Sequence, residues 1–214
     1  MSGRDATART PGVAPSWIGW VLATTVGLSA GTSVSTYLTA PLSAMLSPVL
    51  AGMLFMLLYG AAIGLVLAGA QYFAMQRGTV VLRAWLMASA LGASAGYALA
   101  AVAGELTGNL ISPTVSVVIS EGIIESVGGA IIGLVIGGAQ WWRLRSVMLH
   151  RRKWMIASAI GGALGYSLAA AALELFEVPI LKAHLVLSYG AIFGLFLGAA
   201  QAAVLRTSGR EPNP

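Results

Sequence analysis

Six apolar stretches, each roughly twenty residues or longer, constrain this chain more than any other feature. A helix needs about twenty residues to cross the ~30 Å hydrocarbon core of a bilayer. Only 9% of the residues are charged, against about a quarter in a soluble domain, so we expect lipid to surround most of the chain. The alternating pattern of barrel strands is absent. The sequence therefore predicts an all-α integral membrane protein with six transmembrane helices, at about 17–38, 49–73, 84–104, 116–142, 154–174 and 184–205.

Two spacings of small residues recur along these stretches. In the first, third and fifth, a tryptophan precedes an alanine and two glycines, as in Trp20-Ala23-Gly27-Gly31. In the other three, small residues four apart lead to a glutamine, as in Gly129-Gly133-Gly137-Gln140. This recurrence predicts three copies of a helical hairpin, packed in the same orientation around a pseudo-threefold axis along the membrane normal. The membrane domain is 17–206, with hairpins at about 17–76, 84–145 and 154–206, between a disordered tail at 1–16 and a short tail at 207–214.

The recurrent glycines are expected to pack helices rather than to bind a ligand. Small residues four apart form a flat strip on one helix face and let two backbones approach closely in lipid. No Gly-Lys-Ser/Thr sequence follows them, so they do not form a phosphate loop. The predicted packing positions are Gly27, Gly31, Gly60, Gly64, Gly92, Gly96, Gly129, Gly133, Gly161, Gly165, Gly190 and Gly194.

Basic residues predict the orientation, because eleven of the twelve Lys and Arg lie on one side of the predicted membrane. Lys182 is the exception. The bias places both termini in the cytoplasm, in the plasma (inner) membrane of a bacterium. The prolines Pro41, Pro48, Pro113 and Pro179 are expected to mark the outer loops. The basic loop predicts contact with anionic lipid rather than nucleic acid, at Arg143, Arg145, Arg151, Arg152 and Lys153.

Gln71, Gln140 and Gln201 each lie eleven residues after the first glycine of their strip. Because eleven residues make almost three helical turns, each glutamine shares the glycine face and should point into the bundle. The favoured interpretation is that each amide bonds to a neighbouring helix and holds the hairpins together. The alternative is a polar ring that lines a pore.

A second candidate polar site comprises Glu121, Glu125, Lys182 and His184 near the outer side. Glu125 continues the ladder of small residues into Gly129 and should face inward, where an ionisable group in a membrane is a functional candidate. An ion pair between Glu121 and Lys182 is the structural alternative. A second alternative is a hard-cation site formed by the outer cluster of Glu105, Glu121, Glu125, Glu174 and His184. However, no loop has ligand spacing, so neither metal nor cofactor is predicted.

Catalysis is not expected. The chain has no cysteine, which excludes a thiol nucleophile and thiolate metal sites. Ser94 and His184 invite comparison with an intramembrane serine protease. Ser94 nevertheless lies on a small-residue face, at the position that Ala163 takes in the later copy, so we interpret it as a packing residue.

The motif G-x₃-G-x₃-[GA]-x-x-Q, followed by aromatic and basic residues, resembles one in uncharacterised bacterial multi-pass membrane proteins. GAQWWRLR at 138–145 is the closest stretch. The first copy departs from it after Gln71 (YFAMQR), and the third copy (QAAVLR) lacks the tryptophan. The resemblance covers most of the membrane region. It implies a repeated helical fold and carries no known activity.

Two functions remain after these exclusions. The first is a non-catalytic structural or accessory subunit that stabilises a membrane complex, with a membrane protein or further copies of itself as partner. The second is a small transporter or channel that uses Glu125 and the ring of Gln71, Gln140 and Gln201. The middle of each stretch holds mainly glycine and aliphatic residues, which favours the structural role, because transporters place polar groups there.

Overall fold

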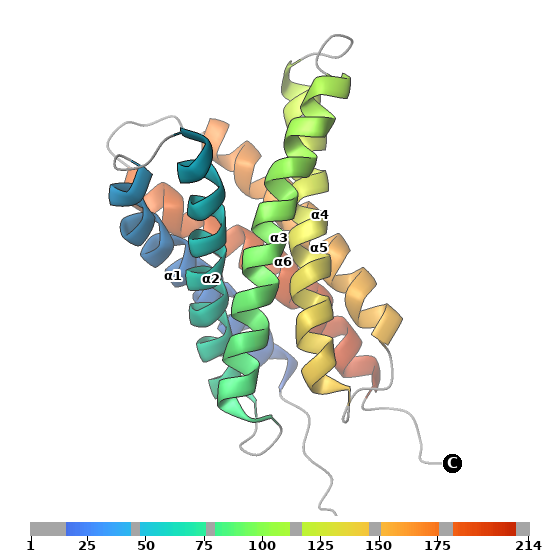
Figure 1. Cartoon of the computed structure of the whole chain (residues 1–214). Helices are drawn as coiled ribbons and strands as arrows, with labels where there is room; N and C mark the ends of the chain where they lie inside the picture. The colour runs from blue at the N-terminus through green and yellow to red at the C-terminus, as the bar shows by residue number, and fades with distance from the viewer. Residues whose placement is uncertain are drawn as a thin grey trace, which may run out of the picture.

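The computed structural model describes residues 16–43, 48–75, 80–111, 117–145, 151–175 and 182–208. These residues form six long helices (Figure 1): α1 (Trp17–Ser43), α2 (Pro48–Ala74), α3 (Leu82–Ile111), α4 (Val117–Leu144), α5 (Arg151–Leu175) and α6 (Lys182–Ser208). All six are long and apolar enough to cross a membrane. The prediction of an all-α protein with six helices long and apolar enough to span a membrane is confirmed. The predicted tails, 1–16 and 207–214, fall almost entirely outside the described residues.

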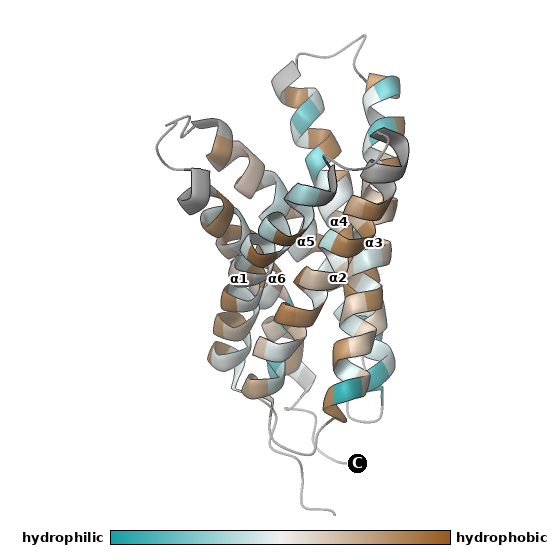
Figure 2. Cartoon of the chain, turned by 60° about the vertical axis from the view of Figure 1, so that its left-hand side comes forward, coloured by the Kyte–Doolittle hydropathy of each residue, from teal (hydrophilic) through white to brown (hydrophobic). Residues whose placement is uncertain are grey.

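The helices form a closed ring. Each packs against the helix before and the helix after it in the sequence, and α6 packs against α1. We call the end where α1, α3 and α5 begin the terminal end, and the opposite end the distal end. Figures 1 and 2 show the helices diverging toward the distal end. The ring therefore has an inside, which is where a functional site would be sheltered from lipid.

Glycines allow neighbouring helices to approach closely. All twelve glycines predicted as packing positions are buried. A Cβ added to Gly194 would lie 2.6 Å from the Thr25 Cα of α1, and one added to Gly133 would collide with the Ser158 carbonyl oxygen of α5. Alanine is too large for such contacts, so the close approach of α4 to α5 and of α6 to α1 depends on glycine.

Large apolar side chains are exposed on the ring, and Figure 2 shows that hydrophobic residues recur along the helices. Leu22, Leu91 and Ile156 are each more than half exposed, at 59%, 65% and 57%. Such surfaces need a lipid environment, which agrees with the class of multi-pass membrane protein.

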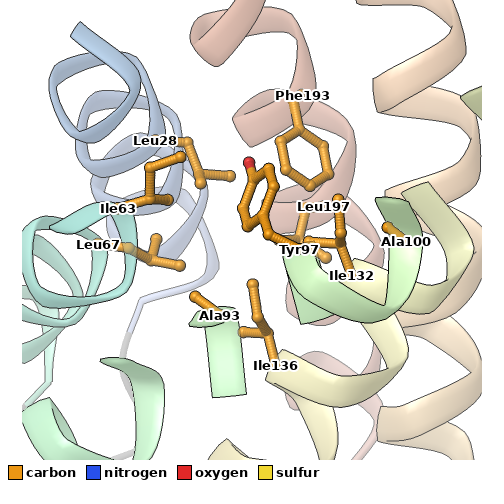
Figure 3. Packing of buried hydrophobic residues seen from close by; sticks show 10 residues of the cluster. All are labelled: Leu28, Ile63, Leu67, Ala93, Tyr97, Ala100, Ile132, Ile136, Phe193 and Leu197. Atoms are coloured by element: carbon orange, nitrogen blue, oxygen red, sulfur yellow. The ribbon is translucent and has the colours of Figure 1, made fainter. Parts of the chain in front are cut away.

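The inside of the ring is filled by side chains. In the middle, aliphatic and aromatic residues of five helices meet in one cluster (Figure 3), namely Leu28, Ile63, Leu67, Ala93, Tyr97, Ala100, Ile132, Ile136, Phe193 and Leu197. A second cluster, around Trp20, Trp85 and Trp154, fills the terminal end. The described side chains therefore pack across the middle and the terminal end of the ring.

The prediction that Pro41 marks a loop is wrong, because α1 continues through Pro41 to Ser43. A proline removes the hydrogen bond to the carbonyl four residues earlier, here that of Tyr37. Since Pro41 lies in the last turn, little helix remains to be disrupted. Pro48 begins α2, a position where the missing N–H has no helical acceptor. Pro113 and Pro179 lie outside the described residues.

Candidate functional site

Three buried glutamines meet inside the ring near the terminal end. Gln71, Gln140 and Gln201 come from α2, α4 and α6, and all three are fully buried. Gln140 Nε2 donates to Gln71 Oε1 at 2.8 Å, and Gln201 Nε2 donates to Gln140 Oε1 at 3.3 Å. The amides thus form a hydrogen-bonded chain that links the three even-numbered helices.

Hydroxyls of the odd-numbered helices complete this network. Gln71 Nε2 donates to Thr24 Oγ1 at 3.1 Å, and Gln201 Nε2 donates to Ser158 Oγ at 3.0 Å. Because Thr24 lies on α1 and Ser158 on α5, the network joins five of the six helices. A buried amide that keeps its hydrogen bonds avoids a large desolvation penalty.

Three tryptophans form a layer beside the glutamines. Trp20, Trp85 and Trp154 are at most 1% exposed and lie near the starts of α1, α3 and α5. The ring centroids of Trp20 and Trp154 are 5.8 Å apart, and those of Trp20 and Trp85 are 6.3 Å apart, both edge to face. Trp20 Nε1 donates to Gln201 Oε1 at 3.1 Å. Each glutamine oxygen therefore accepts a hydrogen bond and each glutamine nitrogen donates one.

Some polar atoms of this region have no protein partner. Among the described residues, Trp85 Nε1, Trp154 Nε1 and Ser89 Oγ are buried without a hydrogen bond. Ser89 lies one helical turn after Trp85, as Ser158 does after Trp154. The two serines thus differ in bonding although their positions in the chain correspond.

The candidate acidic site is more open than the glutamine network. Glu121 is exposed, whereas Glu125, one turn further into α4, is half-buried. Glu125 lies one turn before Gly129, and a Cβ added to Gly129 would meet the Tyr166 Cβ of α5. Lys182 and His184 belong to α6, but their side chains lie outside the described ones, as does that of Glu174.

Neither a metal cluster nor the serine pairing is supported by the described residues. Within them, no three His, Cys, Asp or Glu side chains gather to hold a metal ion. Ser94 Oγ donates to the Leu57 carbonyl of α2 at 2.7 Å, a contact that suits a packing position.

A cavity at the distal end was not predicted from the sequence. It has a volume of about 210 Å³ and is lined chiefly by hydroxyl-bearing residues of five helices, including Thr32, Thr36, Tyr59, Tyr97, Tyr166 and Tyr189. A pattern in the sequence points to it only in retrospect. Tyr97 and Tyr166 follow the second glycine of their strips, while Tyr59 and Tyr189 precede the first glycine of theirs.

The predicted lipid-binding residues lie at the terminal end. Arg145 stacks over the Trp142 ring at 5.3 Å from its centroid, and Arg151 over the Trp141 ring at 4.6 Å. Cation–π contacts hold both guanidinium groups beside aromatic rings, as is typical of a membrane interface.

The fold and its interior define a multi-pass, all-helical membrane protein with a closed ring of helices. The chain matches no family model, no curated protein and no solved structure.

Proposed function

We propose that this protein is a non-catalytic structural or accessory subunit that stabilises a complex in the membrane. The observation that carries the proposal is the filled axis, since tryptophan, glutamine and aliphatic layers follow one another inside the ring. The amide groups are engaged by protein partners and leave little polar capacity for a permeating solute. A rigid bundle with apolar outer faces suits a scaffold.

The proposal includes three hairpins, α1–α2, α3–α4 and α5–α6, related by a pseudo-threefold axis. Corresponding contacts support it. A Cβ on the first glycine of each odd-numbered helix would meet the backbone at the same step of the following helix: Gly27 at Leu67, Gly92 at Ile136 and Gly161 at Leu197. The three tryptophans and the three glutamines also meet inside one ring.

We further propose that the terminal end faces the cytoplasm of a bacterium, with the protein in the inner membrane. The support is the basic bias of the sequence, because Arg83, Arg143, Arg151 and Arg206 all lie at this end. These residues place the cationic side of the bundle beside anionic lipid.

The accessory role is tested by mild extraction of the tagged protein from native membranes, followed by mass spectrometry of the proteins that co-purify. A second tagged six-helix membrane protein of similar abundance is the control. We expect a specific partner in stoichiometric amount. Recovery of the protein alone, with the same background as the control, contradicts the accessory role.

A small transporter is the second candidate, and the distal cavity is the observation that favours it. The cavity lies inside the ring at the distal end, and its lining residue Tyr166 packs against α4 one turn from Glu125. Transport would require the glutamine and tryptophan layers to open. In proteoliposomes, solute uptake that Glu125→Gln abolishes and Glu105→Gln preserves would establish this function in place of the scaffold.

A further inference from the structure

The distal cavity has the form of a binding site rather than a packing defect. Its volume of about 210 Å³ exceeds the ~150 Å³ that suffices for a benzene molecule in a protein core. Five of the six helices contribute to its lining, so its shape depends on the closed ring.

Four tyrosine rings dominate the lining. Tyr59 and Tyr97 have centroids 5.3 Å apart with planes at 82°, and Tyr166 and Tyr189 have centroids 5.2 Å apart with planes at 84°. Within each pair the edge of one ring meets the face of the other, and the face of an aromatic ring carries negative electrostatic potential. Such aromatic clusters attract cations that carry no hydrogen-bond donor, including quaternary ammonium groups.

The two threonine hydroxyls of the cavity donate their protons to backbone carbonyls. Thr32 Oγ1 donates to the Leu28 carbonyl at 2.7 Å, and Thr36 Oγ1 donates to the Thr32 carbonyl at 2.9 Å. Both threonine protons are therefore engaged. The Thr36 hydroxyl also hydrogen-bonds to Tyr59, so the Thr32 oxygen is the threonine acceptor that remains for a ligand. Oxygen lone pairs favour a cation over an anion.

The charged groups near the cavity also favour a cationic ligand. The described lining contains no charged side chain. Glu125 is a half-buried carboxyl on α4, one helical turn before Gly129, and a Cβ added to Gly129 would meet the Tyr166 Cβ. Glu105 and Glu121 are exposed at the same end. Lys182 begins α6 there, and its side chain lies outside those described. Acidic groups around a concave site raise the local concentration of cations.

We propose that the distal cavity binds a small organic cation of the quaternary ammonium class, held among Tyr59, Tyr97, Tyr166 and Tyr189 with Glu125 as the counter-charge. The inference goes beyond the structural role and does not depend on it, because a scaffold can carry such a ligand.

The first test is calorimetric titration of the purified full chain in lipid nanodiscs. The probes are tetramethylammonium, choline, the neutral choline isostere 3,3-dimethyl-1-butanol, and tetrabutylammonium, which is too large for the cavity. We expect saturable binding of at least one of the two small cations, with the isostere at least ten times weaker and tetrabutylammonium excluded. Equal affinity for the isostere, or no saturable binding of either small cation, overturns the proposal.

Variants locate the site. Tyr166→Leu should raise the Kd about tenfold, while Tyr166→Phe keeps the ring and should change it less than threefold. Glu125→Gln should also raise the Kd, and it keeps the shape of the side chain if Tyr166→Leu does not fold. Tyr37→Leu is the matched control, because Tyr37 is 72% exposed on the outside of α1. Binding that survives both Tyr166→Leu and Glu125→Gln overturns the assignment to this cavity. Loss of binding with retention of a co-purifying partner leaves the scaffold role standing.

Discussion

Two serines near the axis differ in a way that only the structure reveals. Ser158 accepts a hydrogen bond from Gln201 at 3.0 Å, whereas the fully buried Ser89 has no partner among the described residues. Removing the Ser158 hydroxyl deprives the buried Gln201 amide of a hydrogen-bond acceptor, which costs stability. Removing the unpaired Ser89 hydroxyl instead relieves the cost of burying a polar group without a partner.

We therefore expect Ser158→Ala to lower the free energy of unfolding by about 1 kcal/mol, and Ser89→Ala to leave it unchanged or raise it slightly. Each variant removes one hydroxyl oxygen from corresponding positions on α3 and α5, so each serves as the control for the other. Unfolding in mixed micelles with increasing dodecyl sulfate, followed by tryptophan fluorescence, measures both. Equal losses of stability would show that Ser89 has a bonding partner in the folded protein.

The glutamines show what residue spacing predicts and what it leaves open. The eleven-residue interval predicted that Gln71, Gln140 and Gln201 share the face of their glycine strips, and all three are buried inside the ring. Their partners Thr24 and Trp20 were not predictable. Both lie on α1, and their contacts with Gln71 and Gln201 depend on how α1 sits between α2 and α6.

At the scale of a helix, α4 offers a matched pair of glycines. A Cβ on Gly133 would collide with the Ser158 carbonyl oxygen of α5, whereas one on Gly138 would lie 3.7 Å from the flexible end of Met155. Five residues separate the two, so they share a helix but not a face.

We expect Gly133→Ala to destabilise the protein by 2 kcal/mol or more, at about the level of overpacking in a core, and Gly133→Leu to prevent stable folding. Gly138→Ala should be neutral or stabilise by up to about 0.8 kcal/mol, because alanine has the higher helix propensity. Expression level and the micelle unfolding assay distinguish the variants. A well-folded Gly133→Leu protein would mean that this strip faces lipid.

Helix lengths were predicted less well than helix number. Hydropathy predicted an end near residue 104 for α3, yet the helix continues to Ile111 and includes the exposed Glu105. Hydropathy reports where lipid surrounds a helix, whereas intrahelical hydrogen bonds can extend it beyond the apolar segment. The same reason accounts for α1, which passes through Pro41.

For the whole molecule, the six helices were predictable but the cavity was not. Its tyrosines come from four different helices, and only the closure of the ring through α1 and α6 brings them together. Spacing within one helix cannot predict such a set. The cavity lies at the distal end, while the tryptophan and glutamine layers lie near the terminal end. The orientation of the protein in the membrane therefore decides whether the cavity lies on the cytoplasmic side or on the outer side.

The natural chain has no cysteine, so single introduced cysteines report orientation without further changes. Glu121 lies at the distal end and Thr207 at the terminal end, and both are exposed. If the terminal end is cytoplasmic, as the basic bias predicts, a membrane-impermeant maleimide added to intact inner-membrane spheroplasts should label Glu121→Cys. It should label Thr207→Cys only after the membrane is permeabilised. The opposite pattern would place the aromatic cavity on the cytoplasmic side, where its cation would have to come from metabolism rather than from outside the cell.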